Sequence, residues 1–225
     1  MVLFVAFCSL GTLALFCQHT AGVLAPGRRS RFLAPIAVVV VILGLIDEVP
    51  KIGVVPAYSA TAALQRSDRA FVAGMERDLP RRAMVFQLPV VEFPEGGNVE
   101  RLYDYDLFKG YLYGTGKLRW SYGGVRGREA DWQVRWARQP TPRMIEGLAA
   151  AGFSALYVDR FGFADRGASL DAALRPLTGR VVAQSHNRRL RWYDLRPVRD
   201  RLRDELSPDE FNSLARAVTR GAHRS

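Results

Sequence analysis

The residues best able to do chemistry are concentrated in one stretch of the chain, from position 86 to position 128. Carboxylates, arginines and aromatic side chains there follow an apolar run that ends at Leu88. Open α/β sheets bind ligands at the carboxyl ends of their strands, which is where these residues are expected. Aromatic faces stack on sugar rings, carboxylates accept hydroxyl hydrogen bonds, and arginine forks bind phosphate. The candidate ligand-binding residues are Gln87, Glu92, Glu95, Asp104, Arg119, Trp120, Tyr122, Arg126, Arg128 and, from a later strand, Asp159.

The same residue types also fit a purely structural role. In that alternative Trp120 and Tyr122 belong to the core, and the carboxylates pair with arginines to hold a loop in place. Asp159, at the end of an apolar run, either presents a carboxylate to a ligand or caps the following turn. The sequence leaves both alternatives open.

Familiar catalytic templates are missing from the sequence. The three histidines, His19, His186 and His223, are scattered, which leaves little from which to build a zinc site or a serine triad. The chain has no Walker loop, no Gly-x-Gly-x-x-Gly after a strand and no Gly-x-Ser-x-Gly. We therefore assign no catalytic residue, no metal and no cofactor from the sequence.

The elements that must position these residues alternate between strands and helices, which predicts an α/β sandwich. Strands are expected at 83–88 and 153–159, followed by a hairpin formed by 181–184 and 190–195. Helices are expected at 59–79, 104–113, 141–151, 169–177 and 211–218, with Ser169 and Ser207 as caps and Gly179 as a stop. Residues 120–132, rich in glycine and aromatics, are expected to be irregular.

The first fifty residues differ from the rest because they contain two apolar stretches. These flank the basic cluster Arg28, Arg29 and Arg31. A bilayer core is about 30 Å thick and needs roughly 20 helical residues to cross it, so the stretches at about 1–24 and 32–49 are near the lower limit. We predict a hairpin of two transmembrane helices. In the alternative, residues 1–22 are a cleaved signal peptide, although no Lys or Arg precedes their apolar core.

Orientation follows from the arginines between the two stretches. Cytoplasmic loops carry an excess of Lys and Arg, so this loop is expected on the cytoplasmic side and the domain after residue 50 outside the cytoplasm. The only cysteines, Cys8 and Cys17, lie in the first stretch, so the exported part has no disulfide to indicate its redox compartment.

The chain is strongly basic, with a formal net charge of +10 that arises almost entirely after residue 50. Such a charge favours anionic partners: lipid headgroups, polyprenyl phosphates, acidic glycans or nucleic acid. Predicted export excludes nucleic acid. Only three of the basic residues are lysines, so genomic composition rather than function is an alternative explanation of the arginine excess.

Several short segments together carry a resemblance to a known group of proteins. They are Asp68 with Phe71, Val72 and Glu76, then 85–89, 93–95, Tyr103 with Asp104, 118–123 and 152–159. In this order they resemble the extracytoplasmic C-terminal domain of large bacterial multi-span proteins similar to GT-C glycosyltransferases, over about residues 35–197. In that superfamily catalysis rests on acidic residues in a loop among many spans. This chain has neither, so the resemblance transfers no catalytic residue.

The sequence thus predicts two N-terminal transmembrane helices (1–50), a linker or docking helix (51–80), an extracytoplasmic α/β domain (81–197) and a C-terminal amphipathic helix with a tail (198–225). The expected function is that of a membrane-tethered envelope module that is not catalytic by itself. It would bind or scaffold polyprenyl-phosphate sugar or anionic glycan beside a multi-span membrane partner. The alternative is a self-sufficient envelope enzyme that acts on sugar or phosphate esters through Asp104, Asp159 and the arginines.

Overall fold

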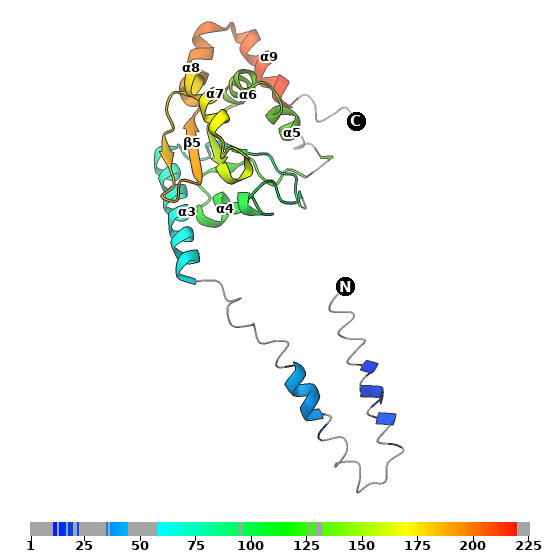
Figure 1. Ribbon diagram of the computed structural model, residues 1–225. Coiled ribbons are helices and arrows are strands. Elements are labelled where there is room, and N and C mark those ends of the chain that lie inside the picture. Colours follow the sequence, from blue (N-terminus) through cyan, green and yellow to red (C-terminus); the bar gives the residue numbers. More distant parts are fainter. Residues whose placement is uncertain are drawn as a thin grey trace. The chain divides into compact units, whose positions relative to one another are not determined.

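The computed structural model describes residues 11–12, 14–16, 18–19, 22, 35, 37–44, 58–94, 96–125, 127–128 and 132–219. By its internal contacts the chain divides into two units, Met1–Tyr58 and Ser59–Ser225. The second unit contains the sheet and nearly all the residues discussed below (Figure 1).

The first unit corrects one sequence prediction. Many residues of the two expected spans, 1–24 and 32–49, lie outside the described set, within which residues 37–44 are helical. Within the described part of the chain, no helix combines the length and apolar character needed to cross a membrane. This overturns the prediction of two transmembrane helices.

The second unit is built on a five-stranded mixed sheet, which confirms the predicted α/β class. Its strands are β1 (Met84–Leu88), β2 (Arg119–Trp120), β3 (Phe153–Asp159), β4 (Ala183–Gln184) and β5 (Leu190–Asp194). Their order is β2-β1-β3-β5-β4. β1 is parallel to both β2 and β3, whereas β5 is antiparallel to β3 and β4. The two parallel strands β1 and β3 therefore end at the same edge.

Helices cover both faces of this sheet, because alternate side chains of each strand point to opposite sides. On one face Val85, Tyr157 and Trp192 pack against α3 (Tyr58–Asp78) and the residues around η1 (Asp106–Phe108). That layer continues into α4 (Lys109–Tyr113). Figure 1 shows α3 and α4 lying apart from the remaining helices.

The other face carries the larger helical layer. Phe86, Leu156 and Tyr193 belong to a second core cluster that includes buried residues of all five later helices. These helices are α5 (Trp132–Ala137), α6 (Thr141–Ala150), α7 (Ala168–Thr178), α8 (Arg196–Glu205) and α9 (Pro208–Thr219). α8 and α9 pack on α6, so the C-terminal segment is part of the same core.

The predicted helices are present, but α5 and α8 were not predicted as helices, and one of the two predicted serine caps is wrong. The expected cap at Ser207 is present: its hydroxyl and the carboxylate of Glu210 lie 2.6 Å apart, and the hydroxyl accepts from the Glu210 N–H. Ser169, in contrast, does not cap α7. The carboxylate of Asp165 accepts hydrogen bonds from the backbone N–H groups of Gly167 and Ser169, both at 2.8 Å, because a carboxylate four residues upstream reaches these donors.

One glycine is required by packing between two of these helices. A Cβ atom on Gly147 in α6 would lie 2.0 Å from the indole of Trp136 in α5. Trp136 is buried, and its Nε1–H donates to the Met144 carbonyl at 3.0 Å. The indole is thus held from two sides, and this fixes α5 against α6.

We predict that Gly147→Ala lowers the free energy of unfolding by about 1–3 kcal/mol, because the tightly packed indole cannot move away. Gly74→Ala in α3 is the matched control. Its Cβ would meet only the Arg77 guanidinium, at 3.7 Å, so improved helix propensity should stabilise the protein by up to about 1 kcal/mol. Urea unfolding followed by tryptophan fluorescence measures both changes, and equal effects of the two substitutions would contradict the prediction.

Candidate functional site

The residues predicted as ligand contacts lie in very different environments. Glu95 and Arg126 fall outside the described residues. Asp104, Arg119 and Arg128 are exposed, and Glu92 is half-buried. The other four, Gln87, Trp120, Tyr122 and Asp159, are buried. The described members of the set are thus divided between the protein surface and the core.

Gln87 uses its amide to hold the loops that follow β1 and β2. Its Nε2 donates to the Leu107 carbonyl at 2.8 Å, and its Oε1 accepts from the Tyr122 N–H at 3.0 Å. Its own backbone N–H donates to the Ser121 hydroxyl at 2.9 Å. Because both ends of the buried amide are occupied within the protein, Gln87 is a structural crosslink.

Trp120 and Tyr122 belong to an aromatic cluster on the α3 face of the sheet. Trp120 packs edge-on against Tyr157, and Tyr122 packs edge-on against Phe108 with ring centroids 5.0 Å apart. The Tyr111 hydroxyl is 2.8 Å from the Trp120 carbonyl and 3.0 Å from the Tyr122 carbonyl, and so holds this segment in place. The core role considered for both residues is the one that the structure shows.

Beside and within this cluster, three tyrosines that were not among the predicted ligand contacts reach the surface. Tyr103 is 70 % exposed, Tyr105 46 % and Tyr111 48 %. Tyr105 stacks on Phe108 at 5.9 Å, and Phe93 packs edge-on against both rings. Rigid aromatic packing therefore presents partly exposed tyrosine faces beside the strand ends.

Asp159 lies at the end of β3 and is locked by an arginine. Its side chain has no exposed surface. Arg189, in the turn between β4 and β5, donates from Nε to both Asp159 oxygens at 2.8 and 2.9 Å, and its Nη2 lies 2.7 Å from Oδ2. The same Nη2 lies 2.8 Å from Asp106 Oδ2. One guanidinium thus bridges two carboxylates.

The charge cluster extends from Asp106 toward α3. Lys109 Nζ lies 3.4 Å from Asp106 Oδ1 and 3.2 Å from Asp68 Oδ2. Asp68 is buried, and its Oδ1 has no hydrogen-bond partner among the described residues, nor does the buried hydroxyl of Tyr157. Within that part of the chain, no group of three His, Cys, Asp or Glu side chains is placed to hold a metal ion.

Electrostatics follow from this burial. Desolvation raises the pKa of Asp159, and the hydrogen bonds and charge of Arg189 oppose that rise. Burial also raises the pKa of Asp106, but the hydrogen bond from Arg189 and the charge of Lys109 outweigh this effect. The pKa of Asp106 is therefore lowered. Burial raises the pKa of Tyr157 well above its usual range. These shifts arise from internal partners and do not mark a site that faces solvent.

Asp159 has a second structural role, because it shapes a neighbouring cavity. Its Oδ1 accepts from the Phe161 N–H at 3.1 Å and so starts η3 (Arg160–Gly162). Gly162 then lies against Pro89, where a Cβ atom would come within 2.3 Å of the proline ring. Phe163, the residue after Gly162, then lines the cavity.

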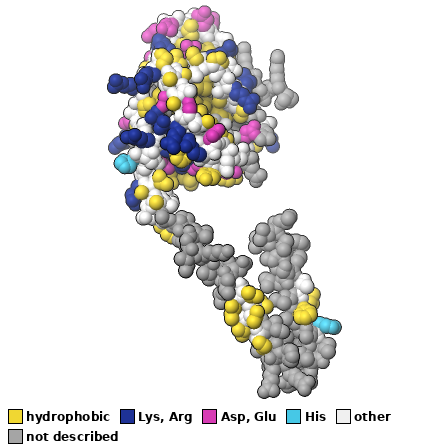
Figure 2. Space-filling view, in the orientation of Figure 1, with side chains coloured by type: hydrophobic (Ala, Val, Ile, Leu, Met, Phe, Trp, Pro, Cys, Tyr) yellow, Lys and Arg dark blue, Asp and Glu magenta, His cyan; other side chains and the backbone are white. Residues whose placement is uncertain are grey.

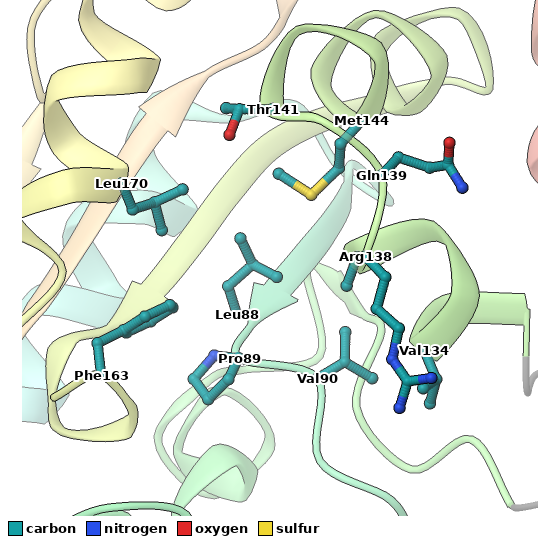
Figure 3. A pocket seen from close by; sticks show the side chains of 11 residues that line it. Leu88, Pro89, Val90, Val134, Arg138, Gln139, Thr141, Met144, Phe163 and Leu170 are labelled. Atoms are coloured by element: carbon teal, nitrogen blue, oxygen red, sulfur yellow. The ribbon is translucent and has the colours of Figure 1, made fainter.

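The cavity lies at the carboxyl end of β1 and has a volume of about 280 Å³. Figure 3 shows Leu88 between Phe163 and Leu170 on one side and Val134 and Arg138 on the other. Its remaining walls come from the residues that follow β1, from the end of α5 and the residues after it, and from the start of α6: Pro89, Val90, Ala137, Gln139, Thr141 and Met144. The lining is mainly apolar, with one guanidinium.

Arg138 is the charged group of this cavity. It is exposed and follows the last residue of α5. No hydrogen bond or ion pair of its side chain to another described residue is found. Arg138 was not among the predicted contacts, because it lies outside the stretch from 86 to 128 and the cavity residues come from five separate segments.

Comparison with known proteins adds no relative, since no protein-family model, curated protein or solved structure matches this chain. The resemblance to the C-terminal domain of GT-C-like proteins therefore stays a prediction.

The charge cluster makes a testable prediction for stability. Arg189→Ala would leave two carboxylates without their main partner, so we expect a loss of about 3–5 kcal/mol in the free energy of unfolding at neutral pH. Adding Asp159→Asn should recover part of this loss, because it removes the buried unpaired charge. Arg188→Ala, on the exposed neighbour, is the control and should change stability by less than about 0.5 kcal/mol.

The loss should also depend on pH. A carboxyl group whose folded pKa is raised binds more protons when folded than when unfolded, so acid favours folding and rising pH opposes it. Without Arg189 the pKa of Asp159 rises further, and Asp106 loses one of the two cations that lower its pKa. The deficit of Arg189→Ala should therefore be largest near neutral pH and shrink as pH falls toward the ordinary carboxyl range. A deficit independent of pH would contradict this account.

Proposed function

We propose that this protein is a non-catalytic binding module for a polyprenyl-phosphate lipid and the sugar it carries. The observation that carries the proposal is the apolar cavity at the end of β1 with the guanidinium of Arg138 at its edge. An amphipathic anion needs such a combination: an apolar space for its chain and a cation where the chain ends.

The apolar part of the cavity suits a short branched hydrocarbon. Leu88, Val90, Met144, Phe163 and Leu170 offer aliphatic and aromatic surface. At roughly 30 Å³ for each water-sized group, 280 Å³ holds on the order of ten heavy atoms, or about two isoprene units. Burial contributes about 0.8 kcal/mol for each CH₂ group removed from water. Only the first isoprene units would be held here, with the rest of the chain outside.

The phosphate would be bound by Arg138. A guanidinium presents several N–H donors in a planar fork that matches phosphate oxygens, and a charged hydrogen bond is stronger than a neutral one. The amide of Gln139 and the hydroxyl of Thr141 also line the cavity and offer further donors. The cation and the polar donors thus belong to the same opening as the apolar walls.

The exposed tyrosines supply a surface for the sugar. The loop after β1 runs from Val90 at the cavity to Phe93 in the aromatic cluster. Three residues span at most about 11 Å, which is comparable to the length of a sugar phosphate. Tyr105 packs on Phe93 and exposes nearly half of its surface. A sugar on the phosphate could therefore stack on this ring.

A ligand of this class resides in a bilayer, so the proposal implies that the domain acts at a membrane surface. It requires no helix of this chain to cross that membrane. A partner that makes or uses the lipid would perform the chemistry, which keeps the scaffolding role expected from the sequence.

The alternative of a self-sufficient esterase or transferase depended on Asp104 and Asp159 acting together. Asp104 is exposed, but Asp159 is fully buried and bound by Arg189, so its oxygens have no open path to a substrate. The geometry favours binding. Turnover of phosphate esters or lipid-linked sugars that Asp104→Asn abolishes would favour the enzyme instead.

The experiment uses farnesyl phosphate, which has three isoprene units and a phosphate, with farnesol as the uncharged probe. We predict that Arg138→Gln weakens farnesyl phosphate by about 1.5–3 kcal/mol, or tenfold or more, because it removes a charged hydrogen bond. Binding of farnesol should be unchanged. Tryptophan fluorescence titration measures both affinities, with Trp132 in α5, the helix that contributes Val134 and Ala137 to the lining, as the reporter.

Two further variants separate the contributions. Leu170→Asn should weaken farnesol and farnesyl phosphate alike, because it places an amide in the apolar wall. Arg143→Gln is the charge-matched control, since Arg143 is exposed on α6 and does not line the cavity. The proposal fails if the native protein binds neither probe, or if Arg138→Gln and Arg143→Gln bind farnesyl phosphate equally well.

A further inference from the structure

A second depression, separate from the cavity beside β1, lies between α7 and the edge of the sheet formed by β4 and β5. Its volume is about 590 Å³. The side chains that give it chemical character are Asp171, Arg175, Arg180, Gln184, Arg191 and Tyr193. Figure 2 shows Lys and Arg side chains gathered on the face of the domain that carries α7 and β5. We call this depression the α7 groove.

The floor of the α7 groove is a fixed polar network. Arg191 of β5 forms an ion pair with Asp171 of α7, and its Nε donates to the Gln184 amide oxygen at 3.2 Å. The Tyr193 hydroxyl donates to the same Asp171 carboxylate. These contacts hold the helix to the sheet edge, and they orient the Arg191 guanidinium without consuming all of its N–H groups.

The rim of the groove carries two exposed arginines. Arg175 and Arg180 are exposed, and neither side chain has an ion pair or hydrogen bond with another described residue. Gly179 adopts φ 76°, a left-handed conformation that ends α7 and turns the chain so that Arg180 lines the same space as Arg175. Two arginines without a partner among the described residues therefore line one opening.

The positive charge is not balanced by the lining. Asp171 is the only carboxylate among the described residues that line the groove, against three arginines. A fourth arginine, Arg160, is close enough to act on Arg191, whose pKa is lowered first by burial and then by that neighbouring charge. Arg160 is itself held in place by the Arg166 and Arg188 carbonyls, at 2.7 and 3.0 Å. Like charges held together in this way favour an anionic ligand.

We propose that the α7 groove is a binding site for a diphosphate group. One phosphate would be bound by the oriented Arg191, and the other by Arg175 and Arg180 at the rim, because guanidinium forks bind phosphate oxygens in pairs. A single phosphate would leave part of this charge unpaired. The shared chemistry is that of the diphosphate, which either inorganic pyrophosphate or an organic diphosphate ester supplies.

The test is calorimetric titration of the full-length protein with inorganic pyrophosphate and with adenosine diphosphate. Inorganic phosphate serves as the comparison with a single phosphate group and should bind at least tenfold more weakly than pyrophosphate. Tighter binding of adenosine diphosphate would identify an ester as the ligand type, and equal binding would identify the diphosphate alone as the feature recognised. Affinity should fall steeply between about 0.05 and 0.5 M salt, because exposed charges are screened.

Arg175→Gln and Arg180→Gln should each weaken pyrophosphate about tenfold, and the double variant should lose detectable binding. Both residues are exposed and outside the core, so the variants should keep the native melting temperature. Arg216→Gln, an exposed arginine of α9, is the charge-matched control, and Arg138→Gln shows whether the cavity beside β1 contributes. Neither should alter pyrophosphate affinity.

Two outcomes would overturn the proposal. One is native protein that shows no pyrophosphate binding at low salt. The other is a double variant, Arg175→Gln with Arg180→Gln, that binds pyrophosphate as tightly as the Arg216→Gln control. If Arg138→Gln alone abolishes pyrophosphate binding, the anion belongs to the cavity beside β1 and the α7 groove is not a site. The test of the α7 groove is independent of whether farnesyl phosphate binds in the cavity beside β1.

Discussion

The contact of Arg189 with Asp159 and Asp106 is the constraint on which the carboxyl edge of the sheet depends. It joins the end of β3, the turn between β4 and β5, and the start of η1. Burying carboxylates without a cation is strongly unfavourable, so this guanidinium stabilises the meeting of the three segments. The Phe161 ring packs against the same guanidinium, with the Arg189 Cζ atom 4.5 Å from the ring centroid.

Consequences extend from this contact to the cavity. Because Asp159 is fixed, it caps η3, and η3 brings Gly162 against Pro89 and Phe163 into the cavity wall. Asp159, which was predicted as a ligand contact, thus supports the cavity wall through η3. The Asp159–Arg189 ion pair holds this wall in place, although neither residue lines the cavity.

The arginines of this protein divide into two physical groups. Some are fully used within the fold: Arg189 bridges carboxylates, and Arg196 forms a forked pair with Asp194 at 2.6 to 3.1 Å. Others, such as Arg138 and Arg175, line an opening and have no partner among the described residues. A bound arginine stabilises architecture, whereas one without a partner keeps its donors for an anion. Net charge alone does not separate the two groups.

Local patterns in the sequence determined much of the fold. The apolar runs at 83–88 and 153–159 are β1 and β3, and the Ser207 capping box begins α9, because periodicity and capping act over a few residues. What the tertiary structure decided depends on distant partners. Asp159 meets Arg189 across 30 positions, the two residues of β2 are a strand only because they pair with β1, and the cavity takes its residues from five segments. The apolar stretches before residue 50 also show what local composition leaves undecided, since it predicted spanning helices that the described structure does not contain. Whether a buried side chain faces a ligand or an internal partner is decided by long-range packing, and no short pattern in the chain records it.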